Sequence, residues 1–205
     1  MNIIAHRGFW KIESEKNSKE AIKRAIDSGF GFETDFRDYG GKILISHNPP
    51  IGTEITADDV FRMYFESGSH EMLALNIKSD GLQDMIGVLL KKYGITNYFF
   101  FDMSVCDTII YVEKQLQIAS RRSEYEKELP FYNDSTTVWV DFFYNETLVI
   151  PEVKKYLGDG KSVCVVSPEL HNREYANLWK QLKSIHHSNL YLCTDYPDKA
   201  KEFFN

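Results

Sequence analysis

The stretch from residue 3 to residue 47 decides the fold, because it contains three apolar runs that each end at a polar, chemically capable group. These runs read IIAHRG (3–8), FETDF (32–36) and ILISH (43–47). A helical segment that opens at Asn17-Ser18 separates the first run from the second. A strand, a helix and a second strand form a right-handed parallel unit, so both strands end on the same side. We therefore expect the polar groups of these ends to converge: His6, Glu33, Asp35 and His47.

Turn and cap residues mark the boundaries within this region. Asn17 can cap the first helix, with Glu20 as the reciprocal partner, and Gly29 suits the end of that helix. Asp38–Gly41 is typical of a hairpin turn that returns residues 42–46 beside the second strand. Thr56 is expected to cap a further helix that runs over residues 57–65.

Farther along, strand-like and helical patterns alternate. Leaving out the hairpin arm, we count about eight strand–helix repeats, which is the number in a closed (βα)8 TIM barrel of the α/β class. An open doubly wound sheet is the competing architecture, but its edge strands would be less uniformly apolar than these. The later strands are predicted at Leu73–Ile77, Tyr98–Met103, Gln117–Arg121, Thr137–Phe142, Ser162–Ser167 and Leu190–Thr194.

Composition limits the possible functions. A chain of 205 residues with 43% hydrophobic and 14% aromatic residues can bury a substantial core, and we expect a single domain spanning residues 1–205. The net charge of −6 argues against a nucleic-acid partner. No apolar run approaches the roughly 20 residues of a membrane span, and the start lacks signal-peptide features, so we expect a cytoplasmic protein. The three cysteines, Cys106, Cys164 and Cys193, are expected to be buried free thiols.

Glu33 and Asp35 are the candidate metal ligands. One residue separates them, so on a strand both side chains point to the same face, roughly 7 Å apart at their α-carbons. Two carboxylates this close repel unless a cation lies between them, and ligation by oxygen alone suits Mg²⁺ or Ca²⁺. A solvated acidic strand or a salt-bridged pair is the alternative interpretation. The flanking His6 and His47 favour the metal.

His6 and His47 are the candidate catalytic residues. Imidazole can take or give a proton near neutral pH, so two histidines that close strands beside a carboxylate pair suit general acid and base catalysis. A lone histidine at a strand end is more often a structural residue. The remaining histidines lack such neighbours and are interpreted as surface or loop residues: His70, His171, His186 and His187.

Taken together, His6-Arg7-Gly8, Asn17, Glu33-x-Asp35 and His47 resemble the signature of the glycerophosphodiester phosphodiesterase family. The stretch from Thr194 to Pro197 resembles the last strand of that family, so the resemblance brackets nearly the whole chain. It implies a metal-dependent phosphoric diester hydrolase of lipid metabolism, built on a barrel of alternating strands and helices.

Three features depart from the family pattern. Where the family carries a third acidic ligand, this chain has Asn76 in Leu75–Lys78, and the resemblance implies that Asn76 completes the metal site. Because an amide brings no charge, the metal should bind more weakly. Asn48 follows His47 where an aspartate is usual. Only residues 49–71 stand where the family has a sizeable insertion, which implies either a more open cleft or a homo-oligomer in which a partner subunit covers it.

The charged residues at other strand ends are the candidate substrate-binding groups. Arg7 and Lys78 each project from a strand end toward the proposed metal, and we expect them to bind the substrate phosphate. A buried structural partner for a carboxylate is the alternative interpretation of Arg7. Arg121, Glu124 and Asp141 are interpreted as recognising the rest of the substrate. Alternation does not decide between Arg121 and its neighbour, although we favour Arg121. Ordinary loop charges are an equal alternative for this second group.

The resemblance implies hydrolysis of a small-molecule phosphodiester with a glycerol-like, sugar or other headgroup. One histidine would deprotonate the attacking oxygen, and the other would protonate the departing alcohol. The sequence does not assign these two roles. A lyase that stops at a cyclic phosphate is one alternative. A barrel that only binds a phosphorylated ligand is another, although a pure binding protein has no evident need for both histidines.

Overall fold

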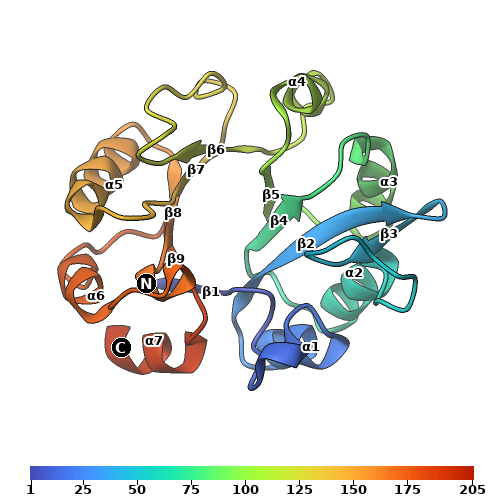
Figure 1. Cartoon of the computed structure of the whole chain (residues 1–205), viewed down its shortest axis with the longest axis horizontal. Coiled ribbons are helices and arrows are strands. Elements are labelled where there is room, and N and C mark those ends of the chain that lie inside the picture. Colours follow the sequence, from blue (N-terminus) through green and yellow to red (C-terminus); the bar gives the residue numbers. More distant parts are fainter.

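The computed structural model describes residues 1–205, and its strands form a barrel surrounded by helices (Figure 1). Eight parallel strands follow the order β5-β4-β2-β1-β9-β8-β7-β6, and β3 pairs antiparallel with β2. The strands are β1 (Asn2–Ala5), β2 (Gly31–Tyr39), β3 (Lys42–Ile45), β4 (Leu73–Ile77), β5 (Tyr98–Phe101), β6 (Ala119–Arg122), β7 (Thr137–Val140), β8 (Ser162–Val166) and β9 (Leu190–Thr194).

The barrel closes weakly at one seam, between β5 and β6. No ladder joins these strands; an isolated bridge between Phe100 and Ile118 does, and the Phe100 N–H donates to the carbonyl of Gln117 at 2.9 Å. Every other neighbouring pair in the ring has a parallel ladder. The predicted (βα)8 architecture is therefore confirmed, as a nearly closed barrel.

Seven α-helices lie outside the ring of strands, which is one fewer than the repeats predicted. No α-helix joins β6 to β7. There the Ser123 hydroxyl accepts hydrogen bonds from the N–H groups of Tyr125 and Glu126, and such local bonds compete with helix formation. The helices are α1 (Lys19–Asp27), α2 (Ala57–Glu66), α3 (Gln83–Tyr93), α4 (Val105–Glu113), α5 (Val149–Gly158), α6 (Ala176–Leu182) and α7 (Pro197–Phe204), with 3₁₀ turns η1 (Glu13–Glu15), η2 (Glu146–Leu148) and η3 (Pro168–His171).

Helix α1 shows how the helices attach to the barrel. Its buried residues are Ala21, Ile22, Ala25 and Ile26, which form one stripe at helical spacing. Each fully buried isoleucine contributes about 1.5–3 kcal/mol. The helix begins at Ser18, whose side chain accepts from the Ala21 N–H, rather than at Asn17 as predicted.

The barrel has two apolar cores. A cluster of 41 buried residues fills the space between the strands and the helices. A cluster of ten lies inside the ring, and its aromatic members Phe101 and Trp139 stack with ring centroids 4.2 Å apart. Successive side chains of each strand point alternately to the outer and the inner cluster. Toward the carboxyl ends of the strands, the inward-facing side chains are polar.

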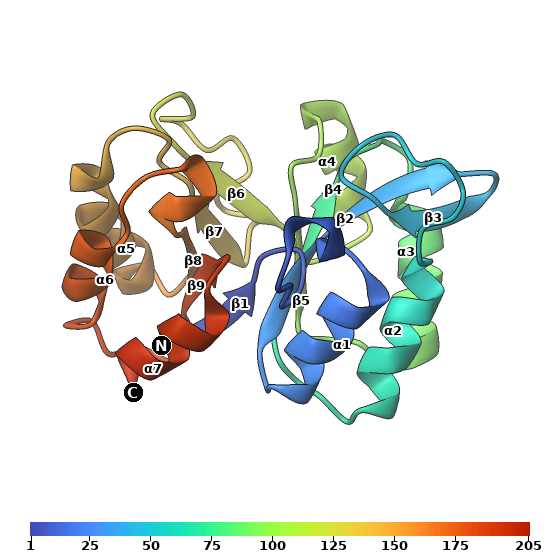
Figure 2. The same ribbon diagram turned by 60° about the horizontal axis from the view of Figure 1, so that its bottom comes forward.

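Details of the boundaries differ from the sequence predictions. Strand β2 continues to Tyr39, and its hairpin with β3 projects beyond the barrel (Figure 2). Strands β5, β7 and β8 end earlier than predicted, because the chain turns into loops at the mouth. Cys164 and Cys193 are buried free thiols as expected, but Cys106 is exposed near the start of α4. None of the seven helices has the length and apolar character needed to cross a membrane.

Candidate active site

The turn after β1 places His6 and Arg7 at the mouth of the barrel. His6 continues the ladder, since its N–H donates to the carbonyl of Thr194 at 3.0 Å. Arg7 and Gly8 then take positive φ angles of 55° and 81°. A Cβ on Gly8 would lie 2.7 Å from the backbone carbon of Ala21. Glycine is therefore required here, both for its conformation and for the close approach of this turn to α1.

Two carboxylates from β2 face into the barrel. Glu33 is 2% exposed and Asp35 is fully buried. Burial, followed by the negative charge of Asp35, raises the pKa of Glu33 to about 8. Burial alone would also raise the pKa of Asp35, but the charges of Arg7 and Lys78 outweigh it and hold that pKa below its usual value. The pKa values of the two acids thus shift in opposite directions, because Arg7 and Lys78 form ion pairs with Asp35 and not with Glu33.

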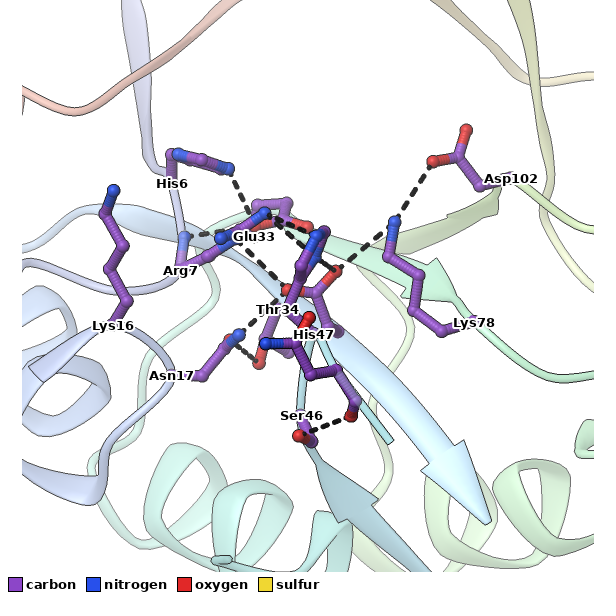
Figure 3. Close-up of polar contacts among 12 residues, drawn as sticks. His6, Arg7, Lys16, Asn17, Glu33, Thr34, Ser46, His47, Lys78 and Asp102 are labelled. Carbon is purple, nitrogen blue, oxygen red and sulfur yellow. Dashed lines mark hydrogen bonds and ion pairs between the residues drawn. The ribbon is translucent and has the colours of Figure 1, made fainter. Parts of the chain in front are cut away.

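Asp35 is the centre of a network of cations and donors, of which Figure 3 labels Arg7, Asn17 and Lys78. The Arg7 Nε lies 3.2 Å and the Lys78 Nζ 3.5 Å from its carboxylate oxygens. Asn17 donates to Asp35 at 2.8 Å and accepts from the Thr34 hydroxyl at 2.9 Å. Asn17, read from the sequence as a helix cap, instead anchors this buried carboxylate from a left-handed backbone conformation with φ 63°.

His6 is held by a partner from the last strand. Its Nδ1 lies 2.6 Å from Asp195 Oδ1, and its Nε2 lies 3.9 Å from Glu33 Oε2. A carboxylate only accepts, so the Nδ1 carries the proton and the Nε2 keeps its lone pair. Burial lowers the pKa of His6, although the charge and hydrogen bond of Asp195 act in the opposite direction. His6 thus presents a neutral, oriented acceptor to the mouth of the barrel.

His47 lies across Arg7 from His6 and is more accessible, with 44% of its side chain exposed. The Arg7 guanidinium lies 2.8 Å from its Nδ1, and Asp35 Oδ1 lies 3.3 Å from the same nitrogen. Because arginine can only donate, Nδ1 accepts in this arrangement and the proton is on Nε2. The two predicted catalytic histidines and Arg7 thus line one pocket.

Asn76 lies on β4, and Lys78 directly follows that strand. Asn76 is the register partner of Asp35 on the neighbouring strand, so both side chains face into the barrel. The Asn76 Oδ1 is buried and has no hydrogen-bond partner. Lys78 bridges two acids, since its Nζ also lies 3.6 Å from Asp102 Oδ2.

The second predicted group is only partly at the mouth. Arg121 lies 3.2 Å from Asp102 and 3.6 Å from Asp141, whereas Arg122 pairs with Glu152 on α5. Glu124 does not join them: its carboxylate accepts from three consecutive backbone N–H groups, those of residues 143–145, at 2.8–3.0 Å. Glu124 orders the loop after β7.

A pocket of about 230 Å³ opens among these side chains. Its polar lining includes His6, Arg7, Glu33, His47 and Lys78. It is also lined by Asn76, Asp102, Asp141 and His171, with Phe101, Trp139, Val166 and Leu170 as the apolar part. Arg7 and His47 border a second, larger groove of about 720 Å³ as well, in which Ile45 and Ile55 are the hydrophobic residues.

Sequence reasoning missed two of these positions. His171 was read as a surface or loop residue, but it lines the pocket with its Nε2 2.6 Å from Asp141 Oδ1. Asp195 lies in the stretch that resembles the last strand of the family, but the sequence does not predict its role as the partner of His6. Both follow a predicted strand of the barrel at its carboxyl end, and that position was the available signal.

The residues at β2 and β4 suit a hard cation in their donor chemistry. Glu33, Asp35 and Asn76 offer oxygen atoms only, and the unpartnered Asn76 Oδ1 is a buried acceptor that lacks a positive partner. No group of three His, Cys, Asp or Glu side chains gathers closely enough to hold a metal. Asn76, the third predicted ligand, is an amide and so is not among these residue types.

This is a barrel with a histidine-bearing polar pocket at the carboxyl ends of its strands, the face where barrels of this class carry their active sites. Solved structures of glycerophosphodiester phosphodiesterases share the fold. The enzyme from Agrobacterium tumefaciens is 13% identical with a TM-score of 0.74, covering 99% of this chain and 98% of that one. A glycerophosphoryl diester phosphodiesterase from Parabacteroides distasonis is 14% identical with a TM-score of 0.68, covering 98% and 85%.

A phosphodiesterase from Oleispira antarctica, solved with its product sn-glycerol-3-phosphate, is 14% identical with a TM-score of 0.72, covering 99% of this chain and 96% of that one. No protein-family model and no curated protein sequence matches this chain. At these identities the likeness establishes the fold, and the residues of the site have to carry the argument for function.

Proposed function

We propose that this protein is a phosphodiester hydrolase that acts on a small glycerophosphodiester-like molecule. The observation that carries the proposal is the placement of His6 and His47 on either side of Arg7, above a carboxylate pair at the barrel mouth. The solved structures of the same fold are named as enzymes of this kind, and one holds sn-glycerol-3-phosphate.

Arg7 and Lys78 are the groups that bind the phosphate. Asp35 ties both cations to one point, 3.2 and 3.5 Å from its oxygens, and so holds them at the same wall of the pocket. Arginine pairs with phosphate oxygens through two parallel N–H donors, and lysine adds a point charge. Together they would offset the negative charge that builds up on the phosphate during the reaction.

His6 is the general base. Asp195 fixes its tautomer so that the Nε2 lone pair is free, and the lowered pKa keeps the ring neutral near pH 7. The Nε2 takes a proton from the attacking oxygen, which is either water or a neighbouring hydroxyl of the substrate. The new bond forms to phosphorus as the bond from phosphorus to the leaving oxygen breaks.

His47 is the general acid. When Arg7 turns to the substrate phosphate, the His47 Nδ1 keeps Asp35 Oδ1 as its neighbour at 3.3 Å, and that oxygen can accept a hydrogen bond from this nitrogen. The protonated ring then gives its Nε2 proton to the departing alkoxide. Its greater exposure suits a group that meets a leaving alcohol.

Glu33, Asp35 and Asn76 would hold a divalent cation, Mg²⁺ or Ca²⁺, which supplies additional positive charge to the phosphate when bound. Glu33 suits this role because no lysine or arginine side chain pairs with it, and the neutral His6 lies 3.9 Å away. The neutral Asn76 makes this a weaker site than three acids would form.

The shape of the site fits a diester, which has an alcohol on each side of its phosphate. The 230 Å³ mouth pocket and the 720 Å³ groove share Arg7 and His47 as lining residues. A phosphate at Arg7 can thus place one alcohol in the pocket and the other in the groove. Apart from Ile45 and Ile55, the residues that line the groove are polar or charged, such as Lys16, Lys19 and Glu54, so it suits a polar leaving group.

The test is hydrolysis of bis(p-nitrophenyl) phosphate with Mg²⁺, Ca²⁺, Mn²⁺ or a chelator. We expect metal-dependent turnover that falls by about 10²–10⁴-fold in His6→Ala and in His47→Ala. Glu33→Ala should lose the response to metal. His186→Ala is the matched control, because this exposed histidine precedes β9 at the opposite end of the barrel.

Turnover that survives the loss of both histidines would refute the assignment. Phosphorus NMR of the products from a glycerophosphodiester separates hydrolysis from a lyase reaction, which ends at the cyclic phosphate. A wild-type protein that binds phosphate esters but turns none over would instead be a binding barrel.

A further inference from the structure

His171 is the one histidine at the pocket that the proposed acid–base chemistry does not use. It ends η3, directly after β8, on a wall formed by a different part of the barrel from Arg7 and Lys78. The turn is firmly held: Pro168 is buried, and the Glu169 carboxylate accepts from the hydroxyls of Ser167 and Thr194 and from the Asp195 N–H. His171 therefore occupies a defined place.

Asp141 fixes which nitrogen of His171 is available. The His171 Nε2 lies 2.6 Å from Asp141 Oδ1, and Asp141 is only 6% exposed. Since a carboxylate can only accept, Nε2 carries the proton and donates it to this bond. In the neutral ring the Nδ1 is then an acceptor, and no group of the chain donates to it. The Phe143 ring packs 4.7 Å from the imidazole and limits its rotation.

The rest of this half of the pocket shows what kind of group it can take. Phe101, Trp139, Val166 and Leu170 make up its apolar lining, and the first two belong to the core inside the barrel. At about 230 Å³ the pocket is smaller than the roughly 300–1,000 Å³ of sites for drug-sized ligands. A short carbon skeleton fits the apolar lining, and a hydroxyl on that skeleton would supply a donor for the free acceptor of His171.

We propose that His171 is a specificity-determining residue whose Nδ1 accepts a hydrogen bond from a hydroxyl of the substrate's alcohol. The pocket then selects phosphate esters of polyols or sugars over those of simple alcohols. Asp141 is a positioning residue in this arrangement, since it acts through the imidazole. The inference rests on the proposed placement of the phosphate at Arg7 and Lys78.

Calorimetric binding tests this without turnover. The two probes are sn-glycerol 3-phosphate and n-propyl phosphate, which share a three-carbon chain and a phosphate but differ in hydroxyl groups. We expect the wild type to bind glycerol phosphate about tenfold more tightly, the usual size of one net hydrogen bond. His171→Ala and His171→Phe should abolish this preference and leave the affinity for propyl phosphate within about twofold.

His171→Phe keeps a ring against Phe143 but has no nitrogen, and His186→Ala is again the control, with its preference intact. Thermal unfolding of each variant shows that it is folded. Equal wild-type affinity for the two probes, a preference retained in both His171 variants, or no binding of either probe would overturn the inference. A wild type that shows the preference but hydrolyses no diester would refute the proposed function alone.

Discussion

Asn17 is the residue for which sequence and structure make the most sharply different predictions. As a helix cap it would contribute about 1 kcal/mol, the usual cost of removing a cap. In the structure its side chain instead joins two buried groups, Asp35 and Thr34. Ser18, the next residue, is the actual cap of α1. The two neighbours should therefore differ strongly when each is truncated.

The magnitude for Asn17 follows from its two bonds. A hydrogen bond to a charged group is worth about 1.5–3 kcal/mol, and a buried hydroxyl left without its partner costs about 1–3 kcal/mol. Asn17→Gly, which tolerates the φ of 63°, should thus lower the free energy of unfolding by about 3–5 kcal/mol. Asn17→Ala should cost about 1 kcal/mol more, because alanine is strained in that conformation. Ser18→Ala should cost about 1 kcal/mol.

Urea unfolding at pH 7 measures these differences. With a slope of about 2 kcal/mol per molar urea, Asn17→Gly lowers the midpoint by about 1.5–2.5 M and Ser18→Ala by about 0.5 M. The comparison is internal, since both variants alter the start of the same helix. If Asn17→Gly cost no more than Ser18→Ala, the buried network around Asp35 would not be contributing as the geometry requires.

Three further predictions concern pH, backbone and thiols. Because burial lowers the pKa of His6, the acidic limb of the pH profile of kcat/KM should lie below the usual histidine range. Asp195→Asn removes the hydrogen bond and charge that raise this pKa, so it should move the limb to still lower pH and reduce kcat. A limb that moves to higher pH would contradict the pairing of His6 with Asp195. Gly8→Ala places a Cβ 2.7 Å from the backbone of α1 at a φ of 81°, so the free energy of unfolding measured by thermal denaturation should fall by at least about 2 kcal/mol. An unchanged midpoint temperature would mean that this turn is not tightly packed. Only Cys106 should react quickly with a thiol reagent in the folded protein, because burial raises the pKa of the Cys164 and Cys193 thiols well above the usual value. Rapid reaction of more than one thiol before denaturant is added would be inconsistent with this packing.

Local patterns carried much of the fold. The apolar runs placed all eight barrel strands, and the Gly-rich turn after Asp38 placed the hairpin, because strand and turn preferences act over a few residues. The prediction of a helix between β6 and β7 was wrong. The Ser123 hydroxyl accepts hydrogen bonds from nearby backbone N–H groups there, and the pattern of hydrophobic residues does not reveal such local bonds. The exposure of Cys106 was missed for a related reason: apolar neighbours in sequence do not say which face of α4 packs on the barrel.

The amino-acid sequence alone determined which chemical groups lie on or just after β1, β2 and β3. The parallel topology was enough to predict that His6, Glu33, Asp35 and His47 gather at one mouth. The tertiary structure decided how those groups are paired. Asp195 reaches His6 across 189 positions of the chain because β1 pairs with β9, and Asp141 reaches His171 across 30 because β7 pairs with β8. A carboxylate sets the tautomer or the pKa of a histidine only when the two side chains lie within a few ångströms of each other. The spacing of two residues along the sequence does not give that distance.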